Sequence, residues 1–205
     1  MNFGGHKTRV LSDGQLSLHA SIVTIGAFDG VHRGHQRLIG EAVEEARHAG
    51  LPSVVMTFDP PPKVFFGRAA RLSRLDDKLA RIAQLGPDYV VVASFTRSYS
   101  ARSPERFLAD IARFGPRRIL VGADFRFGAK QAGDVALLAR HFDVRLAETL
   151  HCRAGEVVSS SRIRALRSEG RATEAAQLQG CRGAAALLAG RLQIQDMRYG
   201  EASHD

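Results

Sequence analysis

The chain has 205 residues, of which 44% are hydrophobic and 24% charged, so it can bury one domain core and does not have the composition of a disordered protein. Its 29 Lys and Arg residues against 21 Asp and Glu give a net charge of +8, which indicates anionic partners. We expect neither nucleic acid nor membrane as a partner, because the arginines are spread along the chain and no apolar run reaches the length of a membrane span. Residues 1–7 lack a signal-peptide core, so we expect a cytoplasmic protein.

The first predicted elements are a leader, a strand and a helix. Residues 1–20 alternate small and polar side chains, and we expect a flexible leader with one short strand near 8–11. Residues 22–25 are apolar and mostly β-branched, which is typical of a strand buried on both faces. After a turn at 26–35, apolar residues recur from Leu38 to Ala46 at the spacing of an amphipathic helix.

The turn at 26–35 has the features of an anion-binding helix start. The first amides of a helix have no partner within it, and the helix dipole adds partial positive charge there. His32 and His35 would share one face of the first turn and could donate hydrogen bonds to a nucleotide. Gly30 and Gly34 fit positions where the backbone bends or approaches a ligand. An ordinary tight turn with two surface histidines is the alternative.

A second strand at 53–58 completes a βαβ unit and therefore predicts a parallel pair. The proline-rich loop from Asp59 to Phe66 follows it, at the end of the strand where open α/β sheets bind ligands. The alternative for this loop is a stiff connector whose Phe65 and Phe66 cover the core.

Two further units follow. Leu75, Leu79, Ile82 and Leu85 predict a helix before a strand at 89–93, and Ser103-Pro104-Glu105 predicts the next helix start, before a strand at 118–121. That last strand runs into 122–128, which is rich in polar and aromatic residues.

In the segment 122–128, Phe125 or Phe127 could face a planar ligand, and Asp124 could accept a hydrogen bond from it. A glycine-bounded turn with a buried aromatic pair is the alternative. Asp134 then predicts the cap of a short helix, and residues 144–147 predict a fifth strand.

Ser159, Ser160 and Ser161 predict a hydroxyl-rich helix start, and Arg162 and Arg164 add guanidinium groups to its first turns. A small helix between residues 170 and 180 and a helical extension with a polar tail over 181–205 complete the prediction. The two cysteines, Cys152 and Cys181, form no metal or redox motif and are expected to be reduced.

At least four βα units in series predict an α/β fold, a doubly wound parallel sheet with its ligand at the carboxyl edge. The turn at 26–35 resembles the Gly-x-Phe-Asp-Gly-x-His-x-Gly-His form of the nucleotidyltransferase signature found in bacterial FAD synthetases, the FMN adenylyltransferases. Residues 122–128 resemble that family's Gly-x-Asp/Asn-Phe-x-Phe-Gly motif, and residues 158–164 resemble its Ile-Ser-Ser-Thr-x-Ile-Arg signature.

The resemblance covers residues 21–180 and implies a single Rossmann-like adenylyltransferase domain of the HxGH type, between the leader 1–20 and the extension 181–205. It implies transfer of AMP from ATP to FMN, with Mg²⁺, giving FAD and pyrophosphate. The family usually carries a riboflavin kinase barrel after this domain, and about 25 residues after Gly180 are too few for it, so kinase activity is not expected.

The site residues that the resemblance implies fall into three groups. The catalytic group is His32, His35 and Arg164. The ATP-binding group is Gly26, Phe28, Asp29, Gly30, Gly34, Ser160 and Ser161. The FMN-binding group is Phe58, Pro60, Pro62, Asp124, Phe125 and Phe127.

Two positions depart from the family pattern. Ala27 stands where the family commonly has Asn, and Pro61 stands where it has His, near the expected FMN phosphate and metal. Two alternatives therefore stay open: a nucleotidyltransferase with a different phosphorylated acceptor, and a catalytically impaired module that binds flavin or nucleotide.

Overall fold

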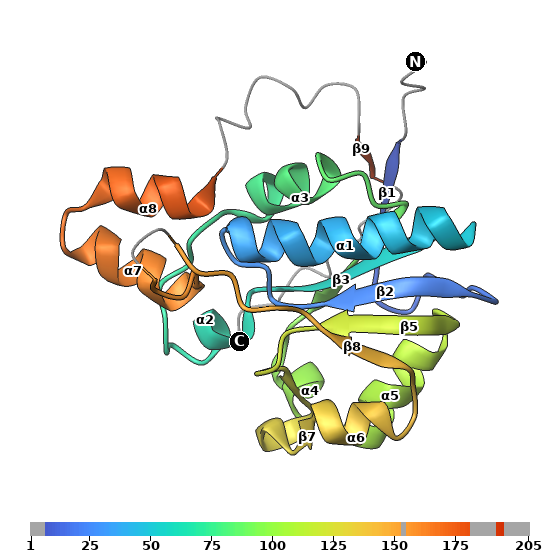
Figure 1. Cartoon of the computed structure of the whole chain (residues 1–205). Helices are drawn as coiled ribbons and strands as arrows, with labels where there is room; N and C mark the ends of the chain where they lie inside the picture. The colour runs from blue at the N-terminus through green and yellow to red at the C-terminus, as the bar shows by residue number, and fades with distance from the viewer. Residues whose placement is uncertain (1–6, 153–154, 181–191, 195–205) are drawn as a thin grey trace, which may run out of the picture.

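A seven-stranded sheet forms the centre of the computed structural model, which describes residues 7–152, 155–180 and 192–194 (Figure 1). Every neighbouring pair of strands in it is parallel, which confirms the predicted doubly wound sheet. The strands, in their order across the sheet, are β8 (Val144–Leu146), β5 (Pro116–Val121), β2 (Ser21–Ile25), β3 (Ser53–Asp59), β4 (Tyr89–Ser94), β1 (Thr8–Ser12) and β9 (Leu192–Ile194).

Helices cover both faces of this sheet (Figure 1). One face carries α1 (Arg33–Ala49) and α3 (Leu75–Ala83), and the other carries α5 (Pro104–Ala112) and α6 (Val135–Ala139). Beyond the carboxyl ends of the strands lie α7 (Ser160–Ser168) and α8 (Ala172–Gln179). The remaining elements are short: α2 (Pro62–Phe65), α4 (Arg97–Ser100), the 3-10 turn η1 (Ala129–Gln131) and the ribbon of β6 (Arg126–Phe127) and β7 (Gly133–Asp134).

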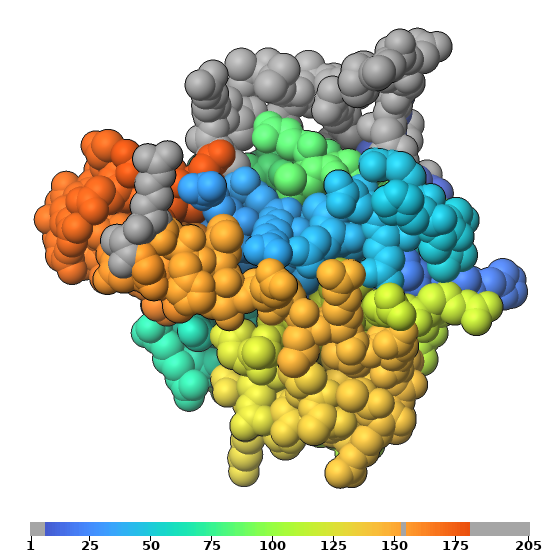
Figure 2. All heavy atoms as spheres, in the orientation of Figure 1, coloured from blue at the N-terminus to red at the C-terminus, as the bar shows by residue number. Residues whose placement is uncertain are grey.

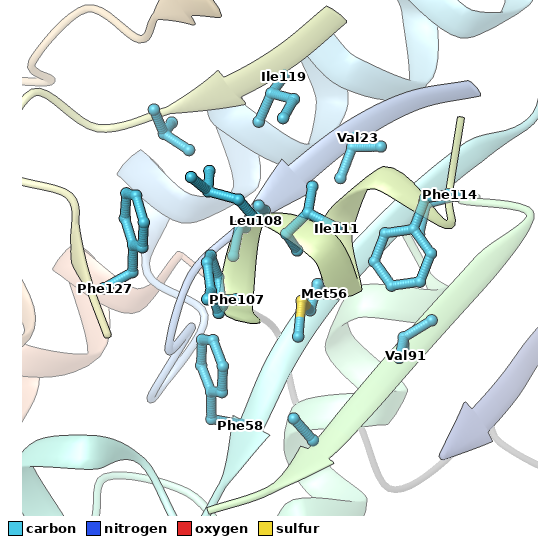
Figure 3. Packing of buried hydrophobic residues seen from close by; sticks show 14 of the residues in the cluster. Val23, Met56, Phe58, Val91, Phe107, Leu108, Ile111, Phe114, Ile119 and Phe127 are labelled. Carbon is cyan, nitrogen blue, oxygen red and sulfur yellow. The ribbon is translucent and has the colours of Figure 1, made fainter. Parts of the chain in front are cut away.

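The core follows from the alternation of side chains along the buried strands. In β2, Val23 and Ile25 point to the face of α5, whereas Ile22 points to the face of α1. Figure 3 shows the first of these layers, in which Phe107, Leu108 and Ile111 of α5 pack on residues of several strands. Both faces of the central strands are therefore apolar, as their β-branched runs predict.

The predicted helix ends are confirmed where polar caps specify them. The Ser103 hydroxyl accepts a hydrogen bond from the Arg106 amide at the start of α5, and Asp134 caps α6 through the Leu137 amide. Gly50 ends α1 with a φ of 64°, a conformation that glycine adopts without steric cost.

The amino-terminal prediction needs a correction. The expected short strand is present as β1, but it pairs with β4 inside the sheet, so residues 8–12 are part of the packed structure and not of a flexible leader. Val10 of β1 is completely buried, and this burial holds the segment in place.

The segment 181–205, where we expected a helical extension and a polar tail, lies mostly outside the described residues, and so does Cys181. The structure describes only Leu192–Ile194 from this segment, and these residues form a strand parallel to β1 where we expected helix or tail. Within the residues that the structure describes, no helix is long and apolar enough to cross a membrane.

Candidate active site

The candidate site lies at the carboxyl edge of the sheet, where the strand order reverses. β2 lies between β5 and β3, so the loops that follow these three strands meet around the first turn of α1. Open α/β sheets bind ligands in the crevice that such a reversal creates. Figure 1 shows α7 and α8 beyond the ends of the strands at this edge, and in Figure 2 the teal atoms around α2 lie next to the orange atoms of α7.

His32 and His35 lie in contact at the start of α1, on one face as predicted. Their rings are stacked, with centroids 3.5 Å apart and planes inclined by 20°. His32 is the N-cap of α1, and its Nδ1 accepts a hydrogen bond of 3.3 Å from the His35 amide. Because Nδ1 is the acceptor, we assign the proton of the neutral ring to Nε2.

Both imidazoles are neutral at pH 7. Burial lowers the pKa of His32 to about 4, and the nearby Asp29 carboxylate offsets this effect only in part. Burial also lowers the pKa of His35, and the charges of His32 and Lys78 act in the same direction. The pair can therefore donate hydrogen bonds to phosphate oxygens, whereas positive charge has to come from other side chains.

The turn before α1 is strained and tightly packed. Phe28 and Val31 adopt positive φ values of 46° and 41°, which are rare for residues with bulky side chains. Such strain persists only where the surrounding structure holds it, and it is common at functional sites. Both side chains are buried in the core, and the Phe28 ring lies edge-on to His35 with the centroids 5.2 Å apart. Phe28 thus supports the histidine pair from inside the protein.

The glycines of this turn allow close approach, as predicted, but the partners in the structure are protein groups. A Cβ on Gly26 would lie 2.8 Å from the Phe28 ring, and one on Gly34 would lie 3.3 Å from the His32 ring. Gly30 has a φ of 79°, and its amide donates a hydrogen bond to the Ser73 hydroxyl.

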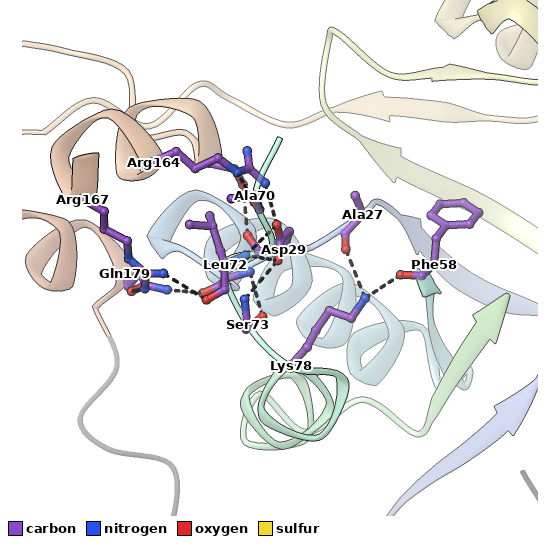
Figure 4. Close-up of polar contacts among 12 residues, drawn as sticks. Ala27, Asp29, Phe58, Ala70, Leu72, Ser73, Lys78, Arg164, Arg167 and Gln179 are labelled. Carbon is purple, nitrogen blue, oxygen red and sulfur yellow. Dashed lines mark hydrogen bonds and ion pairs between the residues drawn. The ribbon is translucent and has the colours of Figure 1, made fainter. Parts of the chain in front are cut away.

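Asp29 connects three distant segments through its buried carboxylate. It accepts hydrogen bonds from the amides of Leu72 and Ser73, and it forms an ion pair with Arg164 at 2.6 Å (Figure 4). Its side chain is 3% exposed, so the charge is compensated almost entirely by these partners. Asp29, predicted as an ATP contact, therefore acts here on the protein itself.

The predicted second helix start lies against the first. The Ser160 hydroxyl donates to the Asp29 carbonyl at 3.0 Å, and the Ser159 hydroxyl caps α7 through the Arg162 amide. Arg164 also donates to the Ala70 carbonyl at 2.7 Å, so its guanidinium ties α7 to the segment before α3. The amino-terminal ends of α1 and α7 consequently meet at the same edge.

A cavity with basic walls opens beside this junction. It has a volume of about 360 Å³ and is lined by Lys63, Arg68, Ala69, Gln131, Ser161 and Arg164. Ser161 and Arg164 belong to α7 and Gln131 belongs to η1, whereas the other three lie in residues 59–69, which we call the α2 segment. Three of the six lining side chains are cationic and none is acidic, which suits a polyanion such as a chain of phosphates.

The predicted FMN residues after β3 lie on the side of α2. Phe58 is 7% exposed and its ring lies edge-on to Phe95, with centroids 6.0 Å apart. Pro62 is the first residue of α2, and Pro60 precedes it in a partly buried position. Pro61 is buried, and its carbonyl accepts hydrogen bonds from the amides of Val64 and Phe65.

The predicted FMN residues after β5 are divided between surface and core. Asp124 is exposed and Phe125 is half-buried. Phe127 is 5% exposed and stacks on Phe107, with centroids 4.9 Å apart. A Cβ on Gly133 would lie 2.4 Å from the Phe127 ring, so the ring is enclosed by protein. Phe125 and Asp124 are the members that face outward.

The sequence analysis missed four groups that build the site: Lys78, the Leu72–Ser73 amides, Gln179 and the basic pair Lys63 and Arg68. Gln179 bridges α8 to the turn, since its amide nitrogen donates to the Gly30 carbonyl and its amide oxygen accepts from Arg167. Only Lys78 left a signal in the sequence, because it occupies the apolar stripe of α3. Backbone amides and loop-to-loop proximity leave no pattern to detect.

Three comparisons with known proteins bear on this geometry. Residues 15–162 match the sequence profile of the family FAD synthetase, which is more than half of the chain. A Geobacillus thermodenitrificans protein named for both riboflavin kinase and FMN adenylyltransferase is 46% identical over 165 residues, covering 80% of this chain and 92% of that protein.

The bifunctional riboflavin kinase/FMN adenylyltransferase of Escherichia coli K12 is 39% identical over 153 residues, covering 70% of this chain and 49% of that protein. The chain therefore spans about half the length of this relative. Among solved structures, a Streptococcus pneumoniae protein described as a macrolide-efflux protein superposes with a TM-score of 0.74 and 26% identity, over 85% of this chain and 61% of that one.

Proposed function

We propose that this chain, which belongs to the FAD synthetase family, is an FMN adenylyltransferase that transfers AMP from ATP to FMN. The observation that carries the proposal is the meeting of two helix starts at one sheet edge, one with the stacked His32 and His35 and one with Ser160 and Ser161. A helix start attracts phosphate through its amides and its dipole, and two of them together suit a triphosphate.

ATP is proposed to lie across the two helix starts. The neutral imidazoles would donate to oxygens of the α-phosphate, and Ser161 with the basic cavity would hold the β- and γ-phosphates. Arg164 keeps its bonds to Asp29 and Ala70 in this arrangement, so it contributes positive charge from a fixed position.

The proposed reaction is a direct in-line displacement. An oxygen of the FMN phosphate forms a bond to the α-phosphorus of ATP, and the bond to the bridging α–β oxygen breaks, so that pyrophosphate leaves with the electron pair. A phosphate monoester is already anionic near pH 7, so the step needs no general base. The catalytic contribution is positioning together with hydrogen bonds to the charge that develops on phosphate oxygens.

We expect Mg²⁺ to bind together with ATP, although the described residues do not form a metal site of their own. No group of three or more His, Cys, Asp or Glu side chains able to hold a metal occurs within residues 7–152 and 155–180. Both oxygens of Asp29 are already bonded. Mg²⁺ commonly relies on substrate phosphates and water for its ligands, so we propose that it enters as Mg·ATP.

FMN is proposed to lie between the α2 segment and the loop after β5. Phe125 and the partly buried Phe65 offer aromatic surface on these two sides, and Asp124 offers an acceptor for polar groups of the flavin. Phe58 and Phe127, in contrast, are packed in the core and leave the flavin contacts to these partly accessible side chains. We propose the cytoplasm as the compartment of this chain.

A different phosphorylated acceptor is the second candidate, and two observations favour it. Ala27 offers no polar side chain in the turn before the histidine pair, and Pro61 is the buried N-cap residue of α2 and has no hydrogen-bond donor. The change at Pro61 lies on the proposed acceptor side, whereas Ala27 lies in the turn of the proposed ATP site, where it removes a polar contact beside the nucleotide.

The test is incubation of the chain with ATP, Mg²⁺ and one acceptor at a time, followed by chromatography for the adenylylated product and a pyrophosphate assay. We expect FAD from FMN, and a loss of about 100-fold or more in His32→Ala and His35→Ala, since each removes a donor to the transition state. His48→Ala is the matched control, because His48 lies in the last turn of the same helix.

Two outcomes would contradict the proposal. Pyrophosphate release that FMN does not stimulate, but another phosphomonoester does, would favour the second candidate. Binding of ATP and FMN without any FAD would indicate a binding module.

A further inference from the structure

Lys78 is a charged side chain in a place where lysine is rarely found. It lies on α3 among the buried residues Leu79 and Ile82 and is 1% exposed. Lysine is almost never fully buried unless its ammonium is paired, because removing the charge from water is costly. The proposed reaction does not use it, so a buried lysine at this position calls for another explanation.

The ammonium of Lys78 is bonded to two backbone carbonyls. Nζ donates to the Phe58 carbonyl at 2.7 Å and to the Ala27 carbonyl at 3.5 Å (Figure 4). Within the described part of the chain, no carboxylate oxygen lies within 4.0 Å of Nζ. Asp59 and Asp29 act on it from farther away. The ammonium is thus held chiefly by main-chain groups.

These two carbonyls belong to the two loops that the reaction has to bring together. Ala27 lies in the turn that leads from β2 to His32, and Phe58 is near the end of β3, where the α2 segment begins. The Thr57 hydroxyl joins the same pair of loops by donating to the Ala27 carbonyl at 3.1 Å. Lys78 therefore bridges the proposed ATP side and the proposed acceptor side.

We propose that Lys78 is a positioning residue whose buried ammonium fixes the turn after β2 relative to the loop after β3, so that the ATP and acceptor phosphates meet in line. This inference rests on the proposed adenylyl transfer. Hydrogen bonds from a charged donor are about twice as strong as neutral ones, so an ammonium holds two carbonyls more firmly than a neutral group would. A displacement of about 1 Å between reacting groups costs about 100-fold in rate.

The electrostatic surroundings agree with this role. Burial lowers the pKa of Lys78 to about 8, while Asp59 and Asp29 raise it and Arg71 lowers it. On the side of α1, the charge of Lys78 is one of the causes that keep the pKa of His35 low. The ammonium form is the better donor, so the bridge weakens as the pH rises above about 8.

The first test compares Lys78→Met with Lys7→Met. Methionine has a similar length and removes the ammonium, and Lys7, which is exposed, provides the same change of charge away from the site. We expect kcat for FAD formation to fall about 100-fold in Lys78→Met, with KM for ATP and FMN within about threefold of wild type. Lys7→Met should match the wild type. Circular dichroism and thermal unfolding are used to check whether both variants are folded.

The second test is the pH dependence of kcat/KM, which stays informative if Lys78→Met does not fold. In the wild type we expect activity to fall above pH 8, because the deprotonated amine is a weaker donor. Lys78→Arg stays charged at every pH in this range, so whatever its residual activity, its alkaline decline should move to higher pH.

The outcomes separate this inference from the proposed function. A wild type that forms no FAD contradicts the proposed function. An active wild type together with a folded Lys78→Met variant of normal kcat overturns the inference about Lys78. A wild-type kcat/KM that stays constant up to about pH 9.5 overturns it as well. The same holds if kcat/KM of Lys78→Arg declines at the same alkaline pH as that of the wild type.

Discussion

The two sides of the site differ in how firmly they are packed. On the side of α1, the charged or polar groups Asp29, His32 and Lys78 are all buried. Asp29 and Lys78 are bonded to distant parts of the chain, and His32 caps α1 through the His35 amide. On the side of α2, the Phe66 ring is 50% exposed, and Lys63 and Arg68 lie at the surface. One side is held by a hydrogen-bond network, whereas the other is held in part by contacts of the exposed Phe66 ring with the partly buried rings of Phe65 and Phe95.

This difference assigns different tasks to the two sides. Donors that stabilise a transition state have to be in place before the reaction, since reorienting them would consume the energy that they supply. An acceptor site gains from side chains that can adjust to a planar ligand. We therefore expect mutations on the α1 side to change stability and rate, and mutations on the α2 side to change mainly affinity.

The largest effect is expected from removing the carboxylate of Asp29. Asp29→Ala leaves the Arg164 guanidinium and the Leu72 and Ser73 amides without their partner, so the free energy of unfolding should fall by about 3 kcal/mol. Unfolding with a chemical denaturant measures this change in the free energy of unfolding. Asp124→Ala is the control, because Asp124 lies in the loop after β5 that faces the proposed acceptor together with the α2 segment, and loss of its exposed carboxylate should change stability by less than about 0.5 kcal/mol. Equal losses in the two variants would remove the distinction between the sides.

A smaller effect is expected from the basic residues of the cavity. Lys63→Ala and Arg68→Ala should each raise KM for ATP about tenfold, because each removes a charged hydrogen bond to phosphate, and kcat should change less. Thermal unfolding should stay at the wild-type temperature, since both side chains are exposed. A fall in kcat without a change in KM would show that the cavity belongs to the rigid side.

The smallest effect is expected for the protonation state of the His32 imidazole, which should stay the same. Its pKa is lowered to about 4 by burial, so the ring should stay neutral from pH 8 to pH 5.5, a range in which an ordinary histidine gains a proton at about 6.5. Proton NMR of the imidazole C–H signals tests this, with the signal assigned by its loss in His32→Ala. A midpoint above pH 6 would contradict the packed description of the α1 side.

The sequence predicts the sheet, its direction and most of the helix ends. Buried parallel strands appear as β-branched runs such as 22–25, and helix caps appear as local patterns such as Ser103-Pro104-Glu105. The stacked histidine pair follows from a spacing of three residues. All these features depend on neighbours in the sequence, and local residue types therefore suffice to predict them.

The sequence does not predict contacts between segments that are far apart. Phe127 has the residue type of a flavin contact, yet its ring is enclosed by Phe107 and Gly133, which only tertiary packing can decide. Residues 192–194 alternate apolar and polar side chains, but a run of three residues is too short to predict a strand, and their pairing with β1 provides the reason for a strand there. The burial of Lys78 does have a local signal, because this lysine interrupts the apolar stripe of α3.

The ion pair between Asp29 and Arg164 has a consequence for how the chain acquires its activity during synthesis. The two residues are 135 positions apart, and a ribosome adds about 5 to 20 residues per second, so the carboxylate emerges about 7 to 27 seconds before its partner. In that interval the sheet strands up to β8 are made, but the turn with the histidine pair lacks the helix that secures it. A nascent or truncated chain that ends before α7 would thus have most of the fold without a finished site for phosphate.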